Sequence, residues 1–133
     1  MAYTALQDLI DRFGVQDLRD AAPNGAGDID PVKVQAAIDD TDGEIDSYLA
    51  AGGYAVPLAP IPKLIAGCAA DLARLRLYDD DAPKPIAERG EQARRLLRSI
   101  TAGEIRLSAA ALGAPAGGMD FETGRRVMPG GGY

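Results

Sequence analysis

Apolar residues recur along this chain at the three- and four-residue spacing of amphipathic helices, and the pattern predicts five helices. The apolar side chains of the first helix form a single stripe: Leu6, Leu9, Ile10 and Phe13. Thr4 and Gln7 have the spacing of a capping box, so we expect Thr4 to cap this helix. Gly14 is a typical stop, and a second short helix is predicted over residues 15–21, with Val15 and Leu18 facing inward.

The third predicted helix spans residues 31–51 and has the clearest beginning. Asp30 is a good N-cap, and Pro31 suits the first helical position. Its inward stripe consists of Val34, Ile38, Thr41, Ile45 and the pair Tyr48 and Leu49. Gly43 lies inside this helix and weakens it by about 1 kcal/mol relative to alanine. We therefore expect another backbone to come close to Gly43, or the helix to bend there.

Two further helices are predicted over residues 62–78 and 85–103, separated from the third by an apolar, proline-rich stretch. The helix over 62–78 is the most apolar and should be central, with Leu64 widening its stripe. Residues 108–133 are rich in glycine and have no hydrophobic period, so no secondary structure is assigned to them. The sequence thus predicts an all-α protein of about five helices in a compact bundle over residues 1–107, with an extended C-terminal arm over 108–133.

Composition supports the helical prediction and argues against several functions. Aromatic residues make up only 5% of the chain, and its small aliphatic residues suit helix packing. The net charge of −6 disfavours tight nucleic-acid binding and an anionic membrane partner. The chain has no histidine, which removes the commonest general base and metal ligand, and one cysteine, which excludes an internal disulfide. We expect no signal peptide and no transmembrane helix.

Three candidate sites have simpler structural interpretations. Asp39, Asp42 and Asp46 share one helix face and could bind a divalent cation, but a solvated acidic face is the better interpretation. The loop over residues 24–30 resembles a calcium loop only in part, because the residue at the closing position is Pro31. Cys68 lies on an apolar stripe, which indicates a buried small side chain. The sequence therefore predicts no catalytic, metal or cofactor site.

Arginines form the one basic stripe of the chain, on the predicted helix over 85–103: Arg89, Arg94, Arg95 and Arg98. The stripe could meet a phosphate backbone. It could also pair with acidic faces such as 39–46, in the same subunit or in the next one. Given the acidic net charge, we favour the second interpretation.

Several segments together resemble the Mu-like phage head–tail junction proteins. They occur in order, as YTALQDLIDRFG at 3–14, DGEIDSYL at 42–49, YAVPL at 54–58, CAADLAR at 68–74 and ARRLLRSI at 93–100. The resemblance covers about residues 1–107, with a looser echo from Phe121 to Val127. It implies an all-helical connector subunit, without catalytic residues, that forms a ring beneath the portal. The chain departs from the family pattern at residues 128–133.

The functional hypothesis is a structural subunit of a phage or phage-like head–tail junction, present in the virion and in the host cytoplasm during assembly. The resemblance implies a homo-oligomeric, dodecameric ring that extends the DNA channel, contacts the portal protein and docks the next neck or tail protein. DNA would pass through its lumen without sequence-specific binding. The predicted interface residues are Arg94, Arg95, Arg98, Phe121, Arg125, Arg126, Val127, Met128 and Tyr133. The alternative is a helical protein–protein adaptor unrelated to virions.

Overall fold

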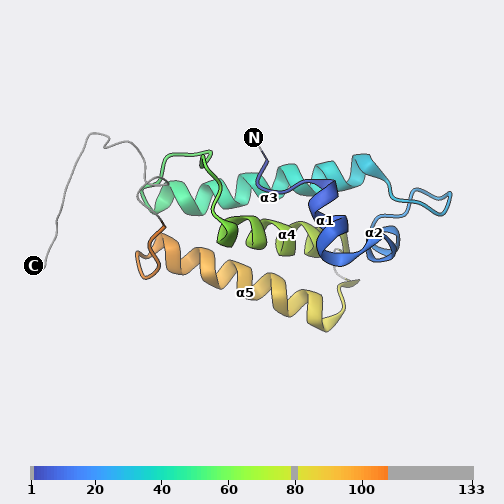
Figure 1. Ribbon diagram of the computed structural model, residues 1–133. Coiled ribbons are helices and arrows are strands. Elements are labelled where there is room, and N and C mark those ends of the chain that lie inside the picture. Colours follow the sequence, from blue (N-terminus) through green and yellow to red (C-terminus); the bar gives the residue numbers. More distant parts are fainter. Residues whose placement is uncertain (1, 79–80, 108–133) are drawn as a thin grey trace, which may run out of the picture.

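A computed structural model describes residues 2–78 and 81–107 of the protein, most of them in α-helices. The helices are α1 (Leu6–Phe13), α2 (Val15–Ala21), α3 (Pro31–Ala51), α4 (Lys63–Tyr78) and α5 (Lys84–Thr101). The three long helices lie side by side, and α1 and α2 pack across one end of them (Figure 1). The all-α prediction is confirmed.

Helix α4 lies at the centre of the bundle, as its apolar sequence predicts. Its buried residues are Ile65, Cys68, Ala69, Ala70, Leu72, Ala73 and Leu77. The first half of α4 packs into an apolar cluster with α5 and the second half of α3. Its second half packs with α1, α2 and the first half of α3. Alanines on α4 let the neighbouring helices approach closely on several sides.

The predicted cap of α3 is correct, whereas the predicted cap of α1 is not. Asp30 caps α3, because its Oδ1 accepts hydrogen bonds from the amides of Val32 at 3.0 Å and Lys33 at 3.4 Å. The predicted cap by Thr4 is wrong: Ala5 precedes α1 without a side-chain cap, and Thr4 is buried. Val15, predicted to face inward, is 38% exposed, because it lies at the edge of the stripe that α2 buries.

Two buried tyrosines hold the non-helical segments against the bundle. The Tyr3 hydroxyl accepts a hydrogen bond from the amide of Leu58 at 2.9 Å, in the proline-rich segment between α3 and α4. The Tyr54 hydroxyl accepts one from the amide of Leu107 at 3.1 Å. The apolar segment therefore packs against the core through Tyr54 and Leu58, and Leu107 is hydrogen-bonded to this segment after α5. No helix in the described ranges is long and apolar enough to cross a membrane.

Candidate assembly surface

The arginines of α5 do not form one basic surface. Helix α5 buries the residues on its apolar side, namely Ile86, Gly90, Ala93, Leu97 and Ile100. Arg94 leaves the helix toward α3 and pairs with Glu44, whereas Arg89 leaves it toward α4 and pairs with Asp71. The positions of the arginines around the helix therefore give each one a different environment.

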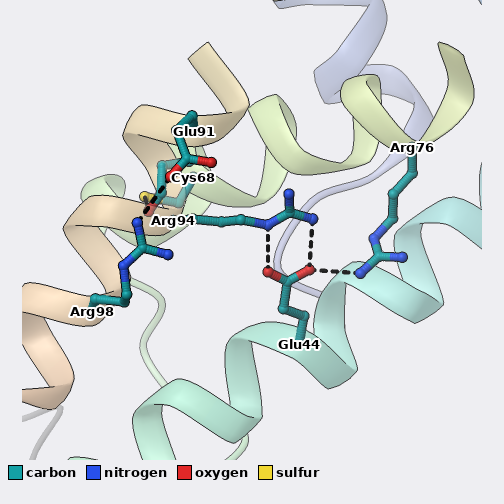
Figure 2. A network of polar contacts seen from close by, with 7 residues as sticks. Glu44, Cys68, Arg76, Glu91, Arg94 and Arg98 are labelled. Atoms are coloured by element: carbon teal, nitrogen blue, oxygen red, sulfur yellow. Dashed lines mark hydrogen bonds and ion pairs between the residues drawn. The ribbon is translucent and has the colours of Figure 1, made fainter. Parts of the chain in front are cut away.

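Glu44 joins the three long helices through two arginines. Arg94 on α5 donates from Nε at 2.8 Å and from Nη2 at 3.3 Å, and Arg76 on α4 donates from Nη2 at 2.6 Å (Figure 2). Burial raises the pKa of the Glu44 carboxyl, but the hydrogen bonds from Arg94 and Arg76 outweigh it and hold this pKa below its ordinary value. The Glu44 side chain is only 18% exposed. Arg94 thus stabilises the bundle within one chain.

The other charged pairs range from partly buried to exposed. Arg74 on α4 donates to Asp17 on α2 at 3.1 and 2.9 Å, and its guanidinium lies 4.2 Å from the centre of the Phe13 ring. This pair ties the short helices to α4. Arg98 pairs with Glu91 on its own helix at 2.9 Å, with both side chains 51% exposed (Figure 2). An ion pair this exposed contributes little to stability.

Arg95 differs from the other arginines of the basic stripe in its contacts. It is exposed and makes no ion pair with any residue in 2–78 or 81–107. With Gln92, Leu96 and Ser99 it lines a hollow of about 390 Å³. Of the predicted interface arginines, Arg95 is therefore the one that is exposed without an ion pair in the described part of the chain.

A second hollow of about 240 Å³ adjoins the first between α4 and α5, and the two share Gln92 and Leu96. Together they form what we call the α4–α5 groove, lined by Lys63, Leu64, Gly67, Cys68, Asp71, Arg89, Gln92, Ala93, Arg95, Leu96 and Ser99. Leu64 is 38% exposed there. Its place beside the main stripe of α4 is the sequence signal for this groove, although that signal alone does not show a surface.

The acidic face of α3 is partly occupied by the N-terminal segment. Asp42 accepts a hydrogen bond from the Tyr3 amide at 3.0 Å, and Asp46 accepts one from the Tyr3 hydroxyl. Burial, followed by donation to Asp46, raises the pKa of Tyr3 to about 12. Burial also raises the pKa of Asp42. Asp39 is exposed and accepts from Gln35 at 2.9 Å. The expected solvated face is therefore correct for Asp39 and wrong for Asp42 and Asp46.

The two remaining candidates keep their structural interpretations. Cys68 is 3% exposed, and burial raises the pKa of its thiol to about 11, so it is packed as a small apolar side chain. The Asn24 side chain accepts hydrogen bonds from the amides of Ala26 at 2.7 Å and Asp28 at 3.2 Å, which closes the loop without an ion. In the described part of the chain, no three potential ligands cluster as a metal site requires.

Residues 3–121 match the family described as bacteriophage Mu, Gp36. The chain belongs to this family. The Mu-like prophage FluMu protein gp36 of Haemophilus influenzae is 32% identical over 107 residues, which cover 79% of this chain and 74% of the relative. This Gp36-family chain is accordingly a Mu-like phage protein of the structural and morphogenetic kind.

The family match extends beyond the helical bundle into the predicted arm, as far as Phe121. The predicted interface residues of that arm lie outside the described part of the Gp36-family chain: Phe121, Arg125, Arg126, Val127, Met128 and Tyr133. Their role and the division at residue 108 stay predictions. Arg94, Arg95 and Arg98 are all described, and only their intramolecular contacts are settled by the geometry.

Proposed function

We propose that this Gp36-family protein is a structural, non-enzymatic subunit of the phage head–tail junction. It forms a homo-oligomeric ring beneath the portal, which extends the DNA channel and docks the next neck or tail protein. The observation that carries the proposal is the family match over residues 3–121, which spans the whole helical bundle. A dodecamer is the stoichiometry that we expect.

The charge distribution supports passage of DNA without tight binding. The chain carries a net charge of −6, and binding to the phosphate backbone requires clustered, unpaired Lys and Arg. On α4 and α5, arginines are instead paired with carboxylates of the same chain: Arg74, Arg76, Arg89, Arg94 and Arg98. Pairing of these five arginines leaves α4 and α5 with fewer free guanidinium groups for a passing duplex.

Reconstitution with the portal tests this proposal. The full-length protein is mixed with the portal protein of the same phage and examined by native mass spectrometry and negative-stain imaging. We expect a ring on one end of the portal, with a subunit number set by the portal. A protein that stays monomeric and unbound at micromolar concentrations of both components would contradict the proposal and favour the adaptor alternative.

The arm is tested separately in the full-length chain. We propose that it reaches a neighbouring subunit or another ring, so Arg125→Glu with Arg126→Glu should weaken assembly on the portal without changing the helical circular dichroism signal. Arg106→Glu is the control, because Arg106 is an exposed arginine that precedes the arm. Equal assembly by the arm variant and the wild type would remove this role from the arginine pair.

A further inference from the structure

The α4–α5 groove combines an apolar floor with a basic rim. Its apolar lining includes Leu64, Cys68, Ala93 and Leu96, which we call the floor, and the cations Lys63, Arg89 and Arg95, which we call the rim, outnumber the single carboxylate of Asp71. Arg89 is paired with Asp71 but its side chain remains 58% exposed, so the rim stays accessible. Its occupant should therefore offer small apolar side chains flanked by carboxylates.

The outer face of α3 has the complementary character. We define it by Val32, Ala36, Asp39 and Gly43, which lie opposite the buried stripe of the helix. Val32 is 77% exposed, and it borders a shallow hollow of about 420 Å³ together with Ala36 and Asp39. The face thus carries a small apolar projection followed by a carboxylate.

Gly43 gives a second, independent indication of a contact on this face. A Cβ atom added at Gly43 would meet nothing within 4 Å, so no part of the described chain explains a glycine there. Within residues 2–78 and 81–107, the backbone approach predicted from the sequence is therefore not found. Another molecule that packs closely on this turn of α3 would account for it.

The two surfaces face away from each other in one subunit. Helices α3, α4 and α5 all contact one another, so the groove between α4 and α5 lies on the side of the bundle opposite the outer face of α3. Figure 1 shows α3 and α5 along opposite edges of the molecule, with α4 between them. A contact between two such surfaces is head-to-tail, and a head-to-tail contact generates a ring when its rotation closes.

We infer that the α4–α5 groove receives the outer face of α3 from a second copy of this chain. Val32 and Ala36 of one copy lie on the floor formed by Leu64 and Leu96 of the next. Asp39 faces the basic rim, where Arg95 is its partner. The inference rests on the proposed function, because it identifies the subunit interface of the proposed ring.

Charge reversal on each side of the contact tests this inference in the full-length protein. Asp39→Arg places like charges at the rim, as does Arg95→Glu on the opposite side. Each single variant should raise the concentration needed for ring assembly on the order of 100-fold, as expected for charge repulsion at an interface. An equimolar mixture of the two variants, or one chain that carries both, should restore assembly.

Asp20→Arg is a matched control for Asp39→Arg. Asp20 is an exposed helix residue that accepts a hydrogen bond from Gln16 at 3.0 Å, as Asp39 does from Gln35 at 2.9 Å. The control makes the same change of charge in the same local setting, but Asp20 lines neither the groove nor the hollow beside Val32, so the variant should assemble like the wild type. Urea unfolding of every variant separates loss of assembly from loss of folding.

The possible results separate failure of the inferred interface from failure of the proposed junction role. If the wild type forms rings and the folded single variants assemble equally well, the inferred interface is overturned and the junction role stands. If single variants fail but neither the mixture nor the double variant recovers, the pairing of Asp39 with Arg95 is refuted. If the wild type forms no ring, alone or on the portal, both proposals are overturned.

Discussion

Replacement of Glu44 by glutamine tests the idea that three helices are joined through one carboxylate. Glu44→Gln keeps the size of the side chain but removes its charge. The one remaining amide oxygen cannot replace both carboxylate oxygens, so Arg94 loses its bidentate contact and Arg76 loses the charge of its 2.6 Å partner, while both guanidinium groups remain between helices. Arg76 is the more sensitive of the two, because its Nε is already buried without a partner in the described residues.

The size of the effect follows from the exposure of the partners. Removal of one member of a fully buried ion pair costs about 3–5 kcal/mol, whereas an exposed pair is worth about 0–1 kcal/mol. The Glu44 side chain is 18% exposed, and both arginine side chains are 32% exposed. We therefore expect Glu44→Gln to lower the free energy of unfolding by about 2 kcal/mol. In a domain of this size, that corresponds to a melting temperature on the order of 10 °C lower.

Equilibrium unfolding in urea, followed by circular dichroism at neutral pH, measures this loss. The matched control is Glu91→Gln, which removes a carboxylate that pairs with Arg98 where both side chains are 51% exposed. The control should cost less than about 0.5 kcal/mol. Equal losses in the two variants would refute the reasoning, because they would show that burial of the Glu44 contacts does not set their strength.

The difference in stability between the wild type and Glu44→Gln should depend on pH in a defined direction. Burial opposes ionisation of Glu44, but its arginine partners hold the pKa below the ordinary value of 4.5. Folding therefore favours the carboxylate. Its contribution is present above pH 4.5 and is lost as the pH falls through the lower pKa of the folded state. The difference in stability between the wild type and Glu44→Gln should be constant near neutral pH and shrink in acid. A difference that grows in acid would contradict this sign.

Three further predictions concern single side chains. Gly43→Ala should raise the free energy of unfolding by about 0.5–1 kcal/mol in urea titrations, because the added methyl group meets open space on a helix. Tyr3→Phe should lower it by about 1–3 kcal/mol, because the buried Leu58 amide loses its acceptor. The Cys68 thiol, with a pKa raised to about 11 by burial, should react with a thiol reagent at pH 8 only as the chain opens, so its rate should follow unfolding in urea.

The beginning of α3 is a feature that neighbouring residues determine and that the sequence predicts correctly. Asp30 and Pro31 set the beginning of α3, because a cap and a fixed backbone angle act within a few residues. The contacts made by Tyr3 are of another kind, since its partners Asp42 and Asp46 lie 39 and 43 residues away. No local pattern distinguishes these two carboxylates from Asp39, so only the packed structure shows which of them is occupied.

The same distinction decides how the basic stripe of α5 should be studied. Its four arginines look equivalent in the sequence, yet Arg94 is bound to Glu44 at 50 residues' separation, whereas Arg95 has no ion pair in the described chain. Substitution of the whole stripe would therefore mix loss of folding with loss of assembly. A variant at Arg94 reports mainly on the stability of the bundle. A variant at Arg95 leaves the described intramolecular ion pairs intact, so a change in its assembly reports on the surface itself.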